Sequence, residues 1–421
     1  MAEQLTRGAA PRPVAVVGAG YAGMAAAVTL AGRGLPVTVF ESGPVPGGRA
    51  RRITTAGRTL DNGQHILVGA YTELLRLMAL VGVPGSALQR LPLELRYADG
   101  FVFRARRLPG PLGPLGALAG LLSCTRLPIA ERVGAVRFMA RLRKTGFRVA
   151  APLTVAKLLG EHRQDGVAGR YLWRPLCVSA LNTPAELASA QAFVNVLRDA
   201  LAGGPGASDL LLPRTDLSRL FPEPACDFVA AHGGEVRLGA PVRNLDDLRR
   251  SFAAIVVAVA PHQLRALLPG SAPSYDYQPI ITCYLQYAAP VAMPFPMLGL
   301  SGGLVQWIFD RGHLNGEPGR IACVISAHGD HERIAHDALA AVCHREISAA
   351  LGGLPPPQWS QIIAEKRATP ACTPGMAHPQ VATPLSGVFL AGDYLDPDYP
   401  PTLEAAVRSG IRAADALFGS L

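Results

Sequence analysis

A strand, a glycine-rich turn and a helix follow one another near the start of the chain, and this order restricts the possible folds most. The β-branched run Val14–Val17 predicts a buried strand of a parallel sheet. The sequence GAGYAG at positions 18–23 follows at once, and an alanine-rich segment to about Arg33 predicts a helix. A second predicted strand, Val37–Phe40, ends at Glu41. The order is typical of an α/β unit that binds a dinucleotide; a glycine turn in an unrelated α/β protein is the alternative.

Each part of this unit has a physical role. Gly18 permits the tight turn, Gly20 lets the backbone approach a pyrophosphate, and Gly23 lets the helix pack closely on the strand. The helix N-terminus presents free N–H groups and a partial positive charge to the phosphates. Glu41 lies eighteen residues after Gly23, where a carboxylate can accept hydrogen bonds from a ribose diol.

The loop after the second strand distinguishes between dinucleotides. Gly47, Gly48 and Arg49 lie where a nicotinamide-binding unit would normally start its next helix. A glycine pair followed by arginine suits a loop that wraps a second time around the dinucleotide, with the guanidinium near phosphate. This loop resembles a second signature of the FAD-dependent amine oxidase and phytoene desaturase superfamily. The resemblance implies that the cofactor is FAD.

Composition sets broad limits on the protein. A chain of 421 residues, 49% of them hydrophobic, is long enough for two packed domains. The seven cysteines are scattered without a CxxC pair, which favours reduced thiols over a disulfide framework and predicts no metal site. The first thirteen residues have no apolar core of a secretory signal, so we expect a cytoplasmic protein.

The net charge of +9 is carried almost wholly by arginine. The arginines are dispersed and form no basic stripe studded with aromatic residues, so we expect no nucleic-acid partner. The positive charge would then suit binding to an anionic membrane surface or to a phosphorylated substrate. An arginine-rich genome is the alternative explanation.

One segment predicts contact with a membrane. Residues 108–125 are uncharged but interrupted by prolines and glycines, so they cannot form a straight transmembrane helix. Residues 129–149 predict a helix with arginines and a lysine among apolar residues. An apolar loop beside a cationic amphipathic helix is typical of a segment that enters an anionic bilayer surface. We therefore expect a peripheral protein on the inner face of the cytoplasmic membrane; a helix packed on its own domain with a solvated basic face is the alternative.

The rest of the chain predicts two kinds of sheet. The apolar run 253–260 returns to the first sheet, and the segment 235–243 predicts a strand with a bend. Residues 277–309 carry no charged side chain. They predict strands at 280–287, 297–300 and 304–309, and a further strand follows at 320–327. This uncharged sheet is either a core face or the floor of a pocket for an apolar substrate. Predicted helices and a hairpin fill the remaining segments: helices 71–81, 129–149, 154–161, 171–179, 184–201 with a Thr183 cap, 222–231 and 331–351, and a hairpin of 93–97 with 101–104.

The end of the chain completes the cofactor site. A strand ends in Gly392 and Asp393, and a helix follows with Pro400 and Pro401 at its start. In the superfamily that this pattern resembles, the carboxylate lies near the ribityl hydroxyls and phosphate. The helix N-terminus there stabilises negative charge on the reduced flavin.

Four segments narrow the resemblance: DNGQHILVGAY at 61–71, LLP at 211–213 with LFPEP at 220–224, QWIFDR at 306–311 and YPPTLE at 399–404. Together they resemble the hydroxysqualene dehydroxylases of bacterial hopanoid biosynthesis, a squalene-associated branch of the superfamily. The resemblance implies reductive conversion of hydroxysqualene, an apolar C30 isoprenoid, to squalene, with reduced FAD as electron source and an external electron donor. It implies FAD contacts from these residues: Gly18, Gly20, Tyr21, Ala22, Gly23, Glu41, Ser42, Gly47, Gly48, Arg49, Gly63, Gln64, His65, Val242, Gly392, Asp393, Thr402 and Leu403.

The fold class that follows is α/β. We expect a Rossmann-type FAD-binding domain from residues 1–75, 210–268 and 380–421, with an amine oxidase or glutathione reductase-like architecture. An inserted α+β substrate domain with a mixed or antiparallel sheet comprises residues 76–209 and 269–379.

Removal of a hydroxyl as water requires a proton donor in a site with little water. His65 is the first candidate, because an imidazole can hold a proton near neutral pH, although it could instead only shape the flavin pocket. Asp61, Asp396, Tyr399 and Glu404 are alternates. Two other functions remain open: dehydrogenation of a long isoprenoid of the phytoene desaturase type, and a non-catalytic flavin-bound scaffold at the membrane.

Overall fold

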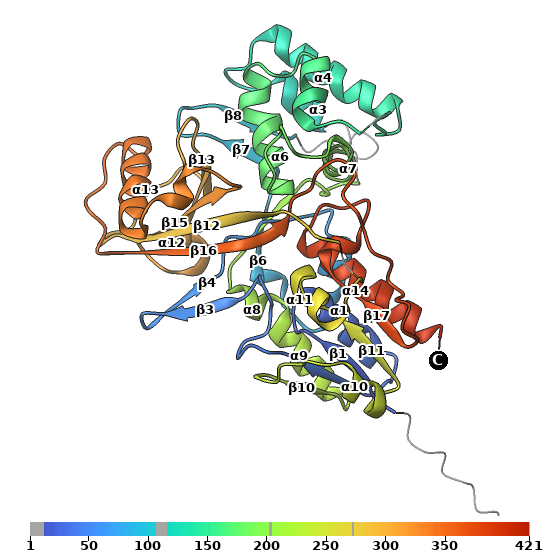
Figure 1. The fold of residues 1–421 in the computed structure, drawn as a ribbon. Helices are drawn as coiled ribbons and strands as arrows, with labels where there is room; N and C mark the ends of the chain where they lie inside the picture. The colour runs from blue at the N-terminus through green and yellow to red at the C-terminus, as the bar shows by residue number, and fades with distance from the viewer. Residues whose placement is uncertain (1–11, 107–115, 151, 202–203, 272, 421) are drawn as a thin grey trace, which may run out of the picture.

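The first sheet is parallel and is assembled from three distant parts of the chain (Figure 1). The computed structural model describes residues 12–106, 116–150, 152–201, 204–271 and 273–420. Its strands lie in the order β10 (Glu235–Arg237), β2 (Val37–Phe40), β1 (Val14–Val17), β11 (Ala254–Val257) and β17 (Val388–Leu390), with every neighbouring pair parallel. The N-terminal part of the chain supplies β1 and β2 of this sheet, the middle part supplies β10 and β11, and the C-terminal part supplies β17.

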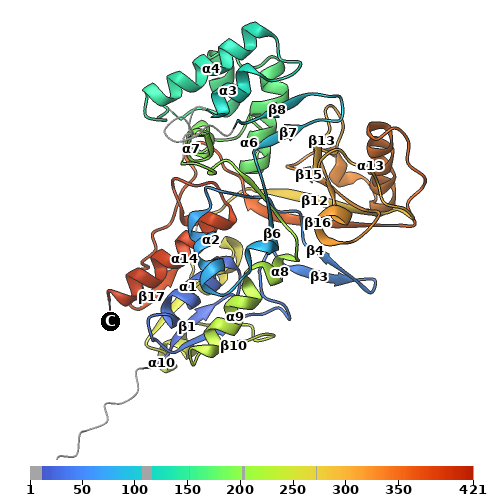
Figure 2. The same cartoon turned by 180° about the vertical axis from the view of Figure 1, so that it is seen from behind.

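Alternate residues of β1 pack into two different cores, because successive side chains of a strand point to opposite faces. Val14 and Val16 belong to a core with α1 (Tyr21–Ala31), α9 (Pro222–Ala231) and α14 (Leu403–Phe418), which lie together in Figure 2. Ala15 and Val17 belong to a core with α10 (Asp246–Ser251) and α11 (Pro261–Leu267). Helices therefore cover both faces of the first sheet.

The second sheet is antiparallel throughout. Its order is β13 (Met297–Gly299), β14 (Trp307–Asp310), β15 (Arg320–Ser326), β12 (Tyr277–Gln286) and β16 (Trp359–Pro370). One face packs on α13 (His336–Ala350) through Cys343 and Ile347, and the other joins the core of the helical region through Tyr284 and Val324. The predicted strands are confirmed, but the sequence did not predict β16, whose charged residues give no clean alternation of apolar and polar positions.

A helical region lies beyond the second sheet, at the top of Figure 1. It comprises the hairpin β7 (Glu94–Arg96) and β8 (Val102–Arg104), then α3 (Gly116–Leu122), α4 (Ile129–Lys144), α5 (Val155–Glu161), η3 (Gly169–Trp173), α6 (Arg174–Leu181) and α7 (Ala190–Leu201). The helix predicted to begin at residue 184 begins at Ala190, so its predicted start was wrong. The Thr183 hydroxyl caps no helix; it donates to the Leu181 carbonyl and accepts from the Cys372 amide.

Short elements connect these regions. They are β3 (Arg52–Thr55), β4 (Arg58–Asp61), β5 (Leu67–Val68), α2 (Thr72–Leu80), η1 (Gly85–Ala87), β6 (Leu88–Leu91), β9 (Leu210–Pro213), α8 (Leu217–Leu220), α12 (Arg311–Asn315), η4 (Asp330–Arg333) and η5 (Asp393–Leu395). Two details differ from the sequence-based expectation: residues 241–243 form no strand, and the helix predicted from 331 begins as an α-helix only at His336.

The segment predicted to touch a membrane is described only in part. Residues 108–115 of the apolar loop lie outside the described residues, and 116–122 form α3. The apolar side chains Phe138, Met139 and Leu142 of α4 are buried in the core of the helical region. None of the helices in the described ranges has the length and apolar character needed to cross a bilayer.

Candidate functional site: a dinucleotide cavity with an apolar end

A cavity of about 1140 Å³ lies between the two sheets. On one side it is bounded by residues at the carboxyl ends of the parallel strands, among them Val17, Glu41, Ala258 and Gly392. Ligands of open α/β sheets bind at this edge. On the other side it is bounded by the second sheet, including Ile280 and residues 365–369. The volume exceeds the roughly 300–1,000 Å³ of pockets for drug-sized ligands, so a dinucleotide has room.

Two glycine loops form a bare backbone cradle at one end. Gly20 and Gly47 are bridged as parallel neighbours, and the Gly47 amide donates to the Ala19 carbonyl at 2.8 Å. A Cβ on Gly48 would come within 3.2 Å of the Gly20 Cα, and Gly48 has φ +62°. Gly23 does not line the cavity; a Cβ there would overlap the Gly18 carbonyl oxygen, so this glycine serves close packing of α1 on β1. The cradle is of the kind that a pyrophosphate requires.

Glu41 closes the end of β2 beside this cradle. Its Oε2 accepts a hydrogen bond from the Ala19 amide at 2.8 Å, and its Oε1 accepts from the Gly43 amide at 2.7 Å. The Ser42 hydroxyl donates to the same Oε1 at 3.2 Å. The carboxylate is thus fixed on the cavity wall, together with Ser42 and Val242.

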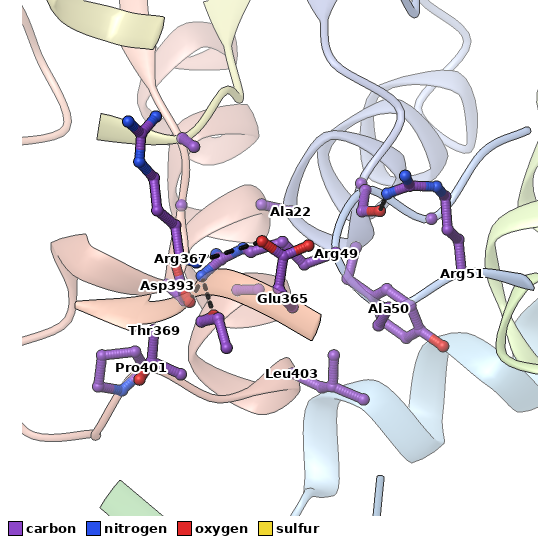
Figure 3. A pocket seen from close by; sticks show the side chains of 18 of the residues that line it. Ala22, Arg49, Ala50, Arg51, Glu365, Arg367, Thr369, Asp393, Pro401 and Leu403 are labelled. Atoms are coloured by element: carbon purple, nitrogen blue, oxygen red, sulfur yellow. Dashed lines mark hydrogen bonds and ion pairs between the residues drawn. The ribbon is translucent and has the colours of Figure 1, made fainter. Parts of the chain in front are cut away.

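Arg49 and Asp393 join the second glycine loop to the end of β17. The Arg49 Nη2 donates to both carboxylate oxygens of Asp393 at 2.7 Å, and its Nη1 donates to the Ala368 carbonyl at 2.6 Å. Figure 3 shows these side chains gathered with Glu365 on one wall. Burial lowers the pKa of Arg49, but the nearby Asp393 outweighs it, so the pKa is raised and the guanidinium stays charged.

The N-terminus of α14 also faces the cavity. Thr402 is the N-cap, since its Oγ1 accepts from the Ala405 amide at 3.2 Å. Thr402 and Leu403 line the cavity, as do Tyr21 and Ala22 in the first turn of α1. Two helix N-termini therefore place their partial positive charges at the same cavity.

His65 lines the cavity but does not have the protonation that the sequence-based hypothesis required. Burial and the nearby Arg49 guanidinium lower its pKa to about 4. The imidazole is therefore neutral at pH 7, because both causes oppose a second positive charge. The reasoning that made His65 a proton donor at neutral pH is not supported; a neutral imidazole facing the cavity remains.

Asp61 does not line the cavity. Its Oδ1 accepts from the Leu217 amide at 2.9 Å and its Oδ2 from the Arg311 Nη2 at 3.1 Å. Burial raises its pKa to about 6 although Arg311 opposes the shift. The neighbouring Gly63, at φ +115°, makes the turn that brings Gln64 to the cavity wall without lining it itself.

The remaining acid candidates lie outside the cavity. Tyr399 packs under the Arg408 guanidinium, 4.7 Å from its ring centroid, and burial raises its pKa to about 12. Glu404 is fully buried and accepts from the backbone amides of Glu73 and Leu74 at the start of α2. Asp396 accepts from the Asp398 amide and pairs with Arg412. In this structure the three carboxyl and phenol groups stabilise the fold.

Several lining residues were not predicted from the sequence. The largest group comes from β16, from the loop after β10 and from α11: Pro241, Arg243, His262, Gln263, Glu365, Lys366, Arg367, Ala368 and Thr369. No local motif marks them, because only the pairing of β16 with β12 brings that strand to the cavity. The uncharged segment 277–309 has both expected roles: Ile280, Trp307 and Phe309 line the cavity, whereas Cys283 and Leu285 are core.

The chain matches the family model for flavin-containing amine oxidoreductases over residues 21–418. It is 31% identical to a hydroxysqualene dehydroxylase of Rhodopseudomonas palustris over 97% of this chain and 99% of that protein. Identity to the hydroxysqualene dehydroxylase of Sinorhizobium fredii is 30%, over 96% of this chain and 98% of that one. A protein named probable zeta-carotene desaturase from Synechococcus elongatus is 23% identical over 96% of this chain and 98% of its own length.

Solved structures share the fold at lower identity. Wild-type putrescine oxidase bound to putrescine has a TM-score of 0.68 and 17% identity, over 97% of this chain and 99% of that one. Cyclohexylamine oxidase from Brevibacterium oxydans has a TM-score of 0.62 and 18% identity, over 97% and 98%. The glycine cradle, the fixed Glu41 and the Arg49–Asp393 pair fit a bound FAD. The chain is thus an FAD-dependent oxidoreductase that belongs to the flavin-containing amine oxidoreductase family, in the branch of the hydroxysqualene dehydroxylases.

Proposed function

We propose that this enzyme removes the hydroxyl of hydroxysqualene reductively and yields squalene, as a step of hopanoid biosynthesis. The observation that carries the proposal is the continuity of one cavity from the glycine cradle to an apolar end. The names of two relatives that match almost the whole chain support it.

The apolar end suits a hydrocarbon substrate. It is lined by Val178, Ala180, Ile280, Trp307, Phe309 and Val324, with Ser179, Asn182 and Ser326 as the polar residues in the same segments. The Trp307 Nε1 donates to the Ser179 hydroxyl at 3.0 Å, so the indole N–H is already satisfied and the ring presents apolar surface. Such walls exclude water, which would otherwise compete for a reactive carbon centre.

The reaction balances with one proton and one hydride. The carbon–oxygen bond breaks with its electron pair on oxygen, which leaves as water after taking a proton. FAD, bound in its reduced form, supplies the hydride that makes the new carbon–hydrogen bond. The chain contributes the apolar walls, the neutral His65 imidazole and the cations that hold the cofactor.

We also propose an external reductant. Within the described residues the first sheet offers one glycine cradle, which FAD takes up. The electrons that reduce the flavin therefore have to come from another molecule.

Desaturation of a long isoprenoid is the second candidate, because the same cavity suits it and a zeta-carotene desaturase relative matches the chain at lower identity. Anaerobic mixing separates the candidates. Reoxidation of reduced enzyme by hydroxysqualene supports dehydroxylation, and loss of the oxidised flavin spectrum on adding a more saturated isoprenoid supports desaturation. A flavoprotein that does neither would be a scaffold.

We further propose peripheral binding to an anionic membrane surface on the cytoplasmic side. Seven arginines and lysines but one glutamate fall between residues 116 and 150. Arg137, Arg141 and Arg143 of α4 are exposed, and so are Leu122 at the end of α3 (52%) and Ile129 at the start of α4 (76%). Cations flanking exposed apolar side chains favour the interface of an anionic bilayer.

Sedimentation with liposomes tests this surface. Wild-type protein should bind vesicles that contain phosphatidylglycerol more than neutral ones, and the R137E/R141E/R143E variant should lose the difference. Equal binding of both proteins to both vesicles would contradict the proposal.

A further inference from the structure

A buried polar network lies directly behind the cavity wall formed by residues 64 and 65. Asp61 and Arg311 form its ion pair, with side chains 2% and 8% exposed. Arg311 uses its two terminal nitrogens for different partners: Nη2 donates to Asp61 Oδ2 and Nη1 donates to Gln64 Oε1, both at 3.1 Å. A planar guanidinium fixes two acceptors at once, which an ammonium cannot do as well.

The other end of the Gln64 amide is also held. Its Nε2 donates to the Tyr284 hydroxyl at 2.7 Å, and that hydroxyl donates to the Asp61 carbonyl at 2.9 Å. The amide oxygen and the amide nitrogen of Gln64 are thus both hydrogen-bonded to residues of the network. Gln64 and His65 meet the cavity from a segment whose position the network determines.

The network joins parts of the chain that are far apart in sequence. Asp61 ends β4, Leu217 begins α8, Tyr284 lies in β12 and Arg311 begins α12. It therefore connects the core of the first sheet, to which Leu217 belongs, with the second sheet, which supplies apolar residues to the cavity wall. The sequence segments DNGQH and QWIFDR thus both supply residues to this network.

We propose that Arg311 is a positioning residue, which sets the Gln64–His65 segment in the cavity wall through its paired contacts to Asp61 and Gln64. The inference rests on the proposed function for its effect on turnover. It requires that loss of the pair move the wall and slow the reaction while FAD remains bound, since the cradle and the Arg49–Asp393 pair lie elsewhere.

The test compares R311K, R311M and D61N/R311M with a matched control. The double variant removes both charges together, because R311M alone leaves a buried carboxylate without its partner and can impair folding. Arg320 is the control: it also pairs with Glu317 but makes no contact with Asp61 or Gln64. R320M should behave as wild type in every assay below.

Two measurements are made on purified enzyme with FAD bound. The first is the single-turnover rate at which hydroxysqualene reoxidises the reduced enzyme, measured over a range of hydroxysqualene concentrations so that the limiting rate and the apparent dissociation constant are separated. The second is quenching of the bound flavin fluorescence by iodide, which reports exposure of the cavity and needs no substrate. The FAD content per protein corrects both for any unfolded fraction.

The expected result is a rate per bound FAD that falls roughly tenfold or more in D61N/R311M, with stronger iodide quenching. R311K should fall between this variant and wild type, because lysine retains the charge but not the paired contacts. Unchanged quenching together with an unchanged rate per bound FAD would overturn the inference. If wild-type enzyme does not react with hydroxysqualene, the proposed function fails, and iodide quenching alone still decides the positioning role: stronger quenching supports it and equal quenching overturns it.

Discussion

Arg49 and Asp393, which are 344 positions apart in the sequence, form a two-point ion pair at 2.7 Å in the wall of the cofactor cavity. The Asp393 side chain is 7% exposed, so Arg49 takes the place of water as the partner of its carboxylate. Loss of either residue should weaken FAD binding, but not equally.

R49M should weaken FAD binding more than D393N. Without Arg49 a buried carboxylate would face the phosphates of the cofactor, whereas D393N leaves the guanidinium available to them. We expect a loss of roughly tenfold or more in affinity for R49M. Titration of apoprotein with FAD measures it. R33M is the control, because Arg33 and Asp415 form an exposed pair far from the cavity; equal losses in R33M and R49M would contradict the role of Arg49.

G48A should lose FAD because it closes the cradle. Gly48 has φ +62°, and a Cβ would press on the Gly20 Cα at 3.2 Å. Gly34 is the matched control: its φ is +80°, but a Cβ there meets nothing within 4 Å. Both variants should lose about 1 kcal/mol of stability from backbone strain. Only G48A should be purified with a low ratio of FAD to protein, and a full complement of FAD in G48A would count against the cradle.

I280Q should impair substrate binding and leave FAD binding intact. Ile280 is half-buried at the apolar end, and an amide there would have to be desolvated by a hydrocarbon. We expect KM to rise roughly tenfold, with a smaller change in kcat. Steady-state kinetics with matched FAD content measures both constants. A rise in KM that is accompanied by an equal loss of FAD would point to a general disturbance of the cavity.

His65 should make stability fall in mild acid. Its folded pKa of about 4 lies below the ordinary histidine value of about 6.5. Between these values the unfolded chain binds more protons, so stability rises with pH and is lost as pH falls from 6.5 towards 4. The contribution of His65 to the free energy of unfolding that is lost over this range is about 3 kcal/mol.

Asp61 has the opposite effect on the pH dependence of stability, because its folded pKa of about 6 lies above its ordinary value. Its contribution makes stability fall as pH rises through the same range. Urea unfolding of wild type and H65Q at pH 4.5 and 7 therefore isolates the histidine. H65Q should lose less stability than wild type on going to pH 4.5. The same change in both proteins would show that His65 is not buried in its neutral form.

The parts of the site that depend on local geometry could be predicted from the sequence. The GAGYAG turn, the strand that ends at Glu41 and the Gly392–Asp393 strand end each carry their reason within a few residues. The two sheets could be predicted from apolar runs such as 253–260 and 280–287.

The parts that depend on pairing over long distances could not. Glu365 reaches the cavity only because β16 pairs with β12, and a strand rich in charged residues gives no periodic signal. The low pKa of His65 depends on burial and on Arg49 across the loop, and neither can be read from the sequence. Asp61 has the residue type of an acid catalyst, but its neighbours in space, Leu217 and Arg311, engage its carboxylate.

The central claim is tested most directly by one anaerobic experiment: enzyme with its FAD fully reduced is mixed with hydroxysqualene while the flavin absorbance is followed and the product is extracted. We expect the oxidised flavin spectrum to return and one squalene to form for each FAD oxidised. A reduced flavin that stays reduced, while oxidised enzyme is reduced by a more saturated isoprenoid, would contradict it.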